Sequence, residues 1–205
     1  MKLRPMFSGG SGNHTKKPIN YPKSILMKAL KIIGLSILGI VVLVLVVALF
    51  IDGKYAVVRE VTINKPKQEV FDYVKYLKNQ DNFSVWAKID PAMKKEFVGE
   101  DATVGFVSAW DSENPDAGKG EQKITKIEEG SRIDYELHFI EPFESTDYAH
   151  LATEAINDSV TSVKWSFNGE MKFPMKLMLL FMDMEAMLAP DLQNGLDNLK
   201  AILEQ

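Results

Sequence analysis

Hydrophobic residues follow three patterns along this chain, and each pattern predicts a different kind of structure. The first is an unbroken run from Ile32 to Ile51, twenty uncharged residues of which sixteen are Ile, Leu, Val or Phe. At a rise of about 1.5 Å per residue, such a run forms a helix of about 30 Å, the thickness of the hydrocarbon core of a bilayer. This pattern predicts one transmembrane helix.

The second pattern is an alternation of apolar and polar residues, which is typical of strands with one buried face. Its clearest case is residues 132–140, where Ile133, Tyr135, Leu137 and Phe139 alternate with charged residues and a histidine. Short turns rich in Gly, Pro, Asn and Asp separate the alternating segments, so we expect one antiparallel sheet. The predicted strands cover residues 55–63, 94–98, 104–110, 121–128, 132–140, 145–156 and 160–169.

The third pattern is a helical spacing of three and four residues. It predicts a helix that opens at Lys65-Pro66, with Asn64 as its N-cap, and that carries apolar residues from Val70 to Leu77 on one face. It also predicts a long closing helix from Met175 to Leu203, kinked or interrupted at Pro190. A sheet with one apolar face needs a cover, so we expect the closing helix to pack on it, which gives an α+β fold class.

These patterns divide the chain into a basic tail at residues 1–23, a transmembrane anchor at residues 24–51 and one folded domain at residues 52–205. The tail is rich in Gly and Pro, and we expect it to be disordered. A cleaved signal peptide is the alternative to the anchor, but the apolar run and the segment before it are both long for one. Only three residues separate the run from the first strand, so the domain should work against the lipid surface.

Charge is distributed unevenly around the apolar run. Seven of the 24 Lys and Arg precede it, whereas all 28 Asp and Glu follow it. The positive flank predicts a cytoplasmic N-terminus and an extracytoplasmic or periplasmic domain, as in a single-pass protein of the bacterial inner membrane. The acidic domain is a poor surface for nucleic acid, so we expect no nucleic-acid partner. With no cysteine, the chain has no disulfide and no thiol chemistry. The oligomeric state is left open.

Several short segments carry a family resemblance. They are VTINKPKQEVF at residues 61–71, WAKIDP at 86–91, GKGE at 118–121, EPFE at 141–144 and VKWSFNG at 163–169. Together they resemble the polyketide cyclase/dehydrase type of the START-like (SRPBCC) superfamily, over about residues 55–204. The resemblance implies a helix-grip fold, in which a curved antiparallel sheet of about six or seven strands wraps around a long C-terminal helix and leaves an apolar cavity. Members bind lipids, sterols, polyketides or plant hormones, and only some are enzymes.

Candidate ligand contacts are the inward positions of the sheet and the methionine-rich start of the closing helix. A filled core is the ordinary alternative for each of them. Small residues among aromatics on the inner face favour a cavity, and six of the ten methionines lie within residues 171–187. The candidates are Phe106, Ser108, Trp110, Gln122, Tyr135, Leu137, Phe139, Asp147, Ala149, Trp165, Phe167, Met175, Met178, Leu179 and Met182.

The polar candidates would orient a ligand head group, and they are Ser108, Gln122, Tyr135 and Asp147. A slip of one residue after Pro142 would turn Asp147 outward. The histidines are expected to be solvated side chains. No metalloprotease, serine-hydrolase or nucleotide-binding motif is present, so we assign no catalytic residue, metal or cofactor.

Our leading interpretation is a membrane-anchored START-like domain that binds a hydrophobic small molecule or lipid, with the bilayer contacted through residues 32–51. One alternative is a cyclase-, dehydratase- or hydrolase-type enzyme that uses Asp147 and Tyr135 for proton transfer. Another is a membrane-bound interaction or stress-response module whose cavity is collapsed and which takes no ligand.

Overall fold

The computed structural model describes residues 23–205, and the chain divides into two compact units that meet at Val46 and Val47. Helix α1 (Lys23–Phe50) makes up the described part of the first unit as far as Val46, and its last four residues belong to the second unit. Its stretch Leu30–Phe50 has a mean hydropathy of 3.2 and is long and apolar enough to cross a membrane. The predicted disordered tail, apart from Lys23, lies outside the described residues.

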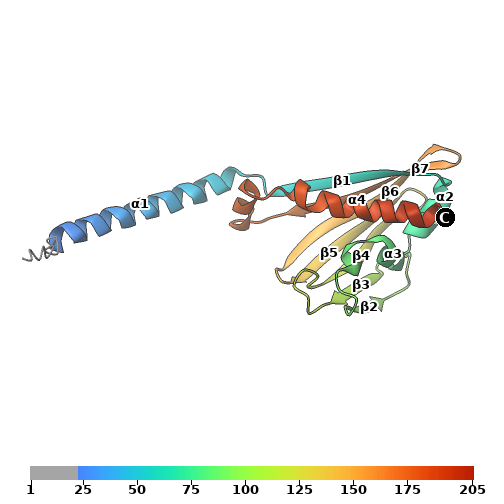
Figure 1. Cartoon of the computed structure of the whole chain (residues 1–205), viewed down its shortest axis with the longest axis horizontal. Coiled ribbons are helices and arrows are strands. Elements are labelled where there is room, and N and C mark those ends of the chain that lie inside the picture. The colour runs from blue at the N-terminus through green and yellow to red at the C-terminus, as the bar shows by residue number, and fades with distance from the viewer. Residues whose placement is uncertain (1–22) are drawn as a thin grey trace, which may run out of the picture. The chain divides into compact units, whose positions relative to one another are not determined.

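The second unit is built on a seven-stranded antiparallel sheet, which confirms the predicted sheet (Figure 1). The spatial order is β1-β7-β6-β5-β4-β3-β2, so the first strand lies beside the last and the remaining strands follow as a meander. The strands are β1 (Lys54–Ile63), β2 (Lys94–Val98), β3 (Val107–Asp111), β4 (Lys119–Glu128), β5 (Arg132–Glu141), β6 (Ser145–Asn157) and β7 (Val160–Glu170).

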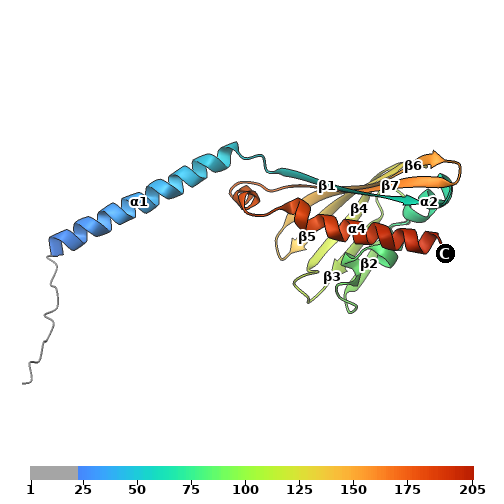
Figure 2. The same ribbon diagram turned by 45° about the horizontal axis from the view of Figure 1, so that its top comes forward.

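One long helix, α4 (Met184–Leu203), lies along the inner face of the curved sheet (Figure 2). Its Leu192, Leu196 and Leu199 are fully buried in a core that the inner faces of β1, β5, β6 and β7 share. This is the expected helix-grip arrangement. The shorter elements are α2 (Lys67–Val74), α3 (Gln80–Phe83) and the 3₁₀ turns η1 (Leu77–Asn79), η2 (Trp86–Lys88) and η3 (Met175–Leu180).

The predicted start of the first domain helix is wrong. Pro66, not Asn64, occupies the N-cap position of α2, and no side chain caps this helix. The fixed φ of Pro66 directs the chain into the helix, and its side chain has no group that could accept from the first N–H groups of α2. The N–H of Asn64 instead donates to Glu204 Oε1 at 2.6 Å.

The predicted interruption of the closing helix at Pro190 is also wrong. The break lies earlier, at Phe181–Asp183, and the Asp183 carboxylate caps α4 by accepting from the N–H of Ala186 at 3.0 Å. The helix then passes through Pro190 without ending. Ala186 and Pro190 are both exposed, so water can reach the carbonyl group that loses its hydrogen bond to the proline.

Candidate functional site

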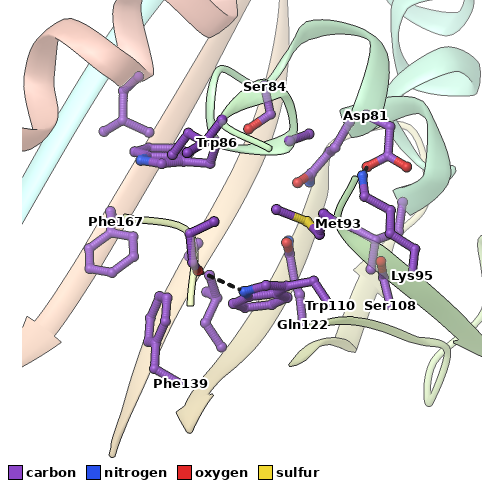
Figure 3. Close-up of a pocket in the computed structure, with 18 of the residues that line it drawn as sticks. Asp81, Ser84, Trp86, Met93, Lys95, Ser108, Trp110, Gln122, Phe139 and Phe167 are labelled. Atoms are coloured by element: carbon purple, nitrogen blue, oxygen red, sulfur yellow. Dashed lines mark hydrogen bonds and ion pairs between the residues drawn. The ribbon is translucent and has the colours of Figure 1, made fainter. Parts of the chain in front are cut away.

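A cavity of about 290 Å³ lies between the inner face of the sheet and the segment that follows α2 (Figure 3). Strands β3 to β7 form its floor, the chain from η1 to the start of β2 covers it, and α4 closes one side. The lining residues are Leu77, Gln80, Asp81, Ser84, Trp86, Ala87, Ile89, Met93, Lys95, Ser108, Trp110, Asp116, Ala117, Gln122, Leu137, Phe139, Ala149, Trp165, Phe167, Leu188 and Leu192.

Strand register places small and large side chains next to one another on the cavity floor. Ser108 pairs with Gln122 and Gln122 with Leu137, so this row crosses three strands on the same face. In the next row, Trp110 pairs with Gly120, and Gly120 with Phe139. The small Ser108 among bulky neighbours leaves space on the floor, whereas Gly120 makes room for the Trp110 ring.

The Trp110 ring is held in one position by its neighbours. A Cβ atom on Gly120 would lie 2.6 Å from indole Cζ2, so glycine is needed for the ring to approach the strand. The indole Nε1 donates to the carbonyl of Ala117 at 3.1 Å, and the ring meets Phe139 edge to face at 5.8 Å (Figure 3). These contacts fix the ring as a rigid wall.

On the opposite wall, a glycine of α4 likewise lets a tryptophan ring approach closely. Trp165 lies so close to Gly195 that a Cβ there would be 2.6 Å from its Cζ3. Trp165 also meets Trp86 at 5.7 Å and Phe83 at 5.6 Å, both edge to face. All three tryptophans of the chain therefore line one cavity, and each is held by specific contacts.

A few polar groups accompany the aromatic walls. Gln80 is only 6% exposed, and within residues 23–205 its Nε2 has no hydrogen-bond partner. Ser84, four residues further along the chain, is also buried, and Ser108 and Gln122 are half-buried on the floor. Lys95 and Asp81 form an ion pair at the edge of the cavity (Figure 3). Such isolated polar groups are those that fix the orientation of a bound molecule.

The structure brings eight of the fifteen sequence-predicted site residues together around this cavity. They are Ser108, Trp110, Gln122, Leu137, Phe139, Ala149, Trp165 and Phe167. Phe106 and Tyr135 are fully buried in the core instead. Burial raises the pKa of Tyr135, and the neighbouring Gln80 side chain lowers it in part, although no hydrogen bond of normal geometry joins the two groups.

Asp147 is also buried on the inner face, with Tyr148 outward, so the predicted register after Pro142 holds. Burial raises the pKa of the Asp147 carboxyl, although the Ser145 hydroxyl donates to it at 3.2 Å. Burial and the nearby Asp147 together raise the pKa of Tyr55 to about 12. Neither Asp147 nor Tyr135 lines the cavity, which is where the enzyme interpretation requires both.

The four candidates from the expected closing helix lie outside the cavity, because the segment before α4 is not part of that helix. Met175 and Met178 are exposed on η3. Leu179 and Met182 border an open groove shared with residues 51–57. In place of these residues, Leu188 and Leu192 of α4 contact the cavity.

Sequence reasoning missed the cover of the cavity. Gln80, Ser84, Trp86 and Met93 come from the stretch between α2 and β2, where the sequence analysis named no ligand contact. The one available signal was Trp86, a large aromatic residue in an otherwise polar stretch, because such a residue rarely lies in an unpacked loop.

Histidine and acidic side chains also lie outside the cavity within residues 23–205. On the outer face, His150 Nδ1 lies 2.6 Å from the Ser166 hydroxyl, but Ser166 is fully buried and no substrate can reach it. Burial, and secondarily Arg132, lowers the pKa of His150. Among the described residues, no group of three or more His, Asp or Glu could hold a metal ion.

A sheet that grips a C-terminal helix over an apolar cavity defines the helix-grip class. The chain belongs to the family described as polyketide cyclase/dehydrase and lipid transport, which matches residues 54–204. No curated protein matches the sequence.

Solved structures share this fold at low sequence identity. Norcoclaurine synthase from Thalictrum flavum, in complex with dopamine and hydroxybenzaldehyde, has a TM-score of 0.55 at 10% identity, over 76% of this chain and 90% of that chain. A protein from Chromobacterium violaceum has a TM-score of 0.52 at 12% identity, over 73% and 97%. One from Rhizobium leguminosarum has a TM-score of 0.50 at 18% identity, over 74% and 95%. At these identities the likeness shows the fold alone.

Proposed function

We propose that this chain is a membrane-anchored binding protein whose cavity takes one small hydrophobic molecule with a flat ring. The observation that carries this proposal is the cavity itself, about 290 Å³ in volume and walled by the rings of Trp86, Trp110, Phe139, Trp165 and Phe167. Aromatic walls favour planar ligands, because stacked and edge-to-face ring pairs add about 0.5–1.5 kcal/mol each beyond the burial of area.

The volume limits the size of the ligand. Binding sites for drug-sized molecules occupy about 300–1,000 Å³, so this cavity is at the lower end of that range. It suits a molecule of one or two rings, or one end of a longer amphiphile, rather than a whole two-chain lipid. Norcoclaurine synthase, which has the same fold, has been solved in complex with dopamine and hydroxybenzaldehyde.

The walls and the polar groups also indicate the affinity and the chemistry. Burial of about 200 Å² of apolar ligand surface at about 25 cal/mol per Å² stabilises a complex by about 5 kcal/mol. Ring contacts add to this and lost motion subtracts from it, so we expect a Kd between micromolar and submillimolar. Gln80, Ser108 and Gln122 favour a ligand that carries a hydroxyl or carbonyl group.

The anchor gives the domain a source of ligand. We place the stretch Leu30–Phe50 across a membrane, with residues 32–51 in contact with lipid and the N-terminus in the cytoplasm. The domain then faces the extracytoplasmic side, in the periplasm of a bacterium. Hydrophobic molecules concentrate in bilayers, so a domain tethered at the surface samples them directly.

Tryptophan fluorescence tests the proposal, since all three tryptophans line the cavity. The full chain in lipid nanodiscs is titrated with 4-bromophenol, a single-ring phenol whose bromine quenches indole only at close contact. We expect saturable quenching with a micromolar to submillimolar Kd.

A matched pair of variants separates the cavity from the surface. Ser108→Leu fills the cavity floor and should weaken quenching at least tenfold, whereas Ser159→Leu, in the exposed β6–β7 turn, should leave it unchanged. Quenching that does not saturate, or that is equal in both variants, would show that the cavity does not bind such a molecule.

A further inference from the structure

The segment between β7 and α4 exposes large apolar side chains. Phe181 is 89% exposed, Leu180 53%, Met175 50%, Phe173 50% and Met178 40%. Exposed apolar side chains that cluster in one short segment are uncommon on a soluble surface and mark a site of interaction. This segment, Phe173–Phe181, is outside the cavity and the proposed binding function does not use it.

The 3₁₀ turn η3 and the residues on either side of it present these side chains to solvent. With three residues per turn, positions three apart lie above one another, so Met175 and Met178 share a face of η3, while Phe173 precedes the turn and Phe181 follows it. Leu177 and Leu179 lie on the other sides and are half-buried. The segment therefore presents an apolar ridge outward.

Two hydrogen bonds join this segment, and Met171 just before it, to Ile51 at the end of the apolar run and to Gly53. The N–H of Met171 donates to the carbonyl of Gly53 at 2.9 Å, and Lys176 Nζ donates to the carbonyl of Ile51 at 2.9 Å. The contact is close, because a Cβ on Gly53 would lie 2.2 Å from the Met171 carbonyl oxygen.

These bonds limit how far the segment can lie from the bilayer. The stretch that can span the membrane ends at Phe50, one residue before Ile51. The Lys176 side chain bonds to Ile51 and the Met171 main chain bonds to Gly53, so the start of the segment lies within a few residues of the end of the proposed span. The occupant that this position favours is lipid rather than a protein partner.

The charges around the ridge also fit a lipid interface. Lys172 is exposed just before the ridge, whereas Lys176 is half-buried within it and its ammonium group donates to the Ile51 carbonyl. Lysines beside apolar side chains place their ammonium groups among lipid head groups while the apolar groups enter the membrane.

We propose that Phe173–Phe181 inserts into the bilayer interface as a second membrane contact, which fixes the orientation of the domain. The inference rests on the proposed membrane span but not on ligand binding. Strand register relates this contact to the cavity. Lys54 pairs with Glu170 next to the segment, and Phe139 of the cavity pairs with Ser145 at the same end of the sheet. The end of the sheet that carries Trp110 and Phe139 then faces the lipid.

Single cysteines test this directly, because the chain has none of its own. Phe181→Cys and Ile156→Cys are made in the full chain, labelled with the environment-sensitive fluorophore NBD, and reconstituted into phosphatidylcholine vesicles with or without doxyl-labelled lipid. Ile156 is 57% exposed and lies at the other end of the sheet, so it is the matched control. We expect doxyl lipid to quench the label at position 181 at least threefold more than the label at position 156.

Each outcome bears on a different claim. Equal quenching at the two positions, with the protein floating with the vesicles, would overturn the second contact and leave the anchor in place. Failure to float would overturn both the anchor and the second contact. Bromophenol quenching of the tryptophans is measured on the same samples. Saturable quenching shows that the labelled variants are folded, and its absence shows a failure of ligand binding that is separate from the membrane contact.

Discussion

The inner face of the sheet is filled at one end and hollow at the other, although the same strands β5, β6 and β7 run through both. At the filled end, Ile133, Leu151 and Val163 have no exposed surface and pack into one core with Leu196 and Leu199. At the hollow end, the same strands contribute Phe139, Ala149 and Phe167 to the cavity.

The two ends differ in how well their side chains can pack into gaps. Aliphatic side chains interdigitate and close small gaps, so the filled end reaches the density of an ordinary core. Trp110 and Trp165 are rigid rings, and each is already held by a glycine and by other rings. They cannot turn inward, and the space between them stays open. A cavity in this fold thus depends on side chains that are fixed in place.

The largest expected effect is loss of stability at the filled end. Leu196→Ala should lower the free energy of unfolding by about 2–5 kcal/mol, because it leaves a void in a dense core. Urea unfolding measures the change. Leu188→Ala, at the half-buried edge of the cavity, should cost under about 1.5 kcal/mol, since space is already present there. Equal costs would contradict the division into two ends.

A smaller change in stability, with a clear loss of binding, is expected from Gly120→Ala. The new Cβ would lie 2.6 Å from both the Trp110 ring and the His138 carbonyl oxygen, so the ring or the strand must move. We expect a loss of about 1–3 kcal/mol in stability and at least a tenfold weaker bromophenol complex in the fluorescence titration. An unchanged Kd would show that the position of Trp110 does not shape the site.

Asp147→Asn should raise the free energy of unfolding at neutral pH, by less than the two preceding core substitutions lower it. Burial raises the pKa of this carboxyl, so its charged form disfavours the folded state, and stability falls as the pH rises through the folded pKa. Melting temperatures across pH 3–8 measure the effect. The gain should vanish below about pH 4, where the wild-type carboxyl is protonated in both states. Asp158→Asn, in the exposed β6–β7 turn, is the control and should change little at any pH.

The smallest expected effect concerns the outer face. Burial lowers the pKa of His150, so the unfolded chain takes up a proton at this residue before the folded chain does. Stability should therefore decrease as the pH falls below about 6.5, the ordinary pKa of histidine. His150→Gln should flatten this part of the stability curve, and a curve that keeps its slope would contradict the prediction.

The sequence allowed the sheet to be predicted well and the cavity only in part. Alternation in residues 132–140 reports directly which side chains share a face, and the strand that contains them matches the prediction closely. The cavity cover depends on how the chain from Gln80 to Met93 folds back over the sheet. That path is decided by tertiary contacts such as the meeting of Trp86 with Trp165, which no local pattern encodes.

The closing helix shows a different limit. Apolar spacing continues through Met178 and Met182, so the pattern predicted one helix where the structure has a 3₁₀ turn, a break and then α4. The signal that could have found the break was Asp183, three residues before the Ala186 N–H that it caps. Pro190 was the more conspicuous residue, but a single exposed proline does not end this helix.

The pairing of β1 with β7 has a consequence for biosynthesis. Lys54 pairs with Glu170, so the strand made first within the domain finds its partner only after the intervening meander has been synthesised. Contacts this distant along the chain form slowly, and strand edges that wait for a partner are prone to mispairing. Until β7 has been made, the unpaired edge of β1 stays close to the apolar run that precedes it. A membrane at that run would limit how often this edge meets other chains.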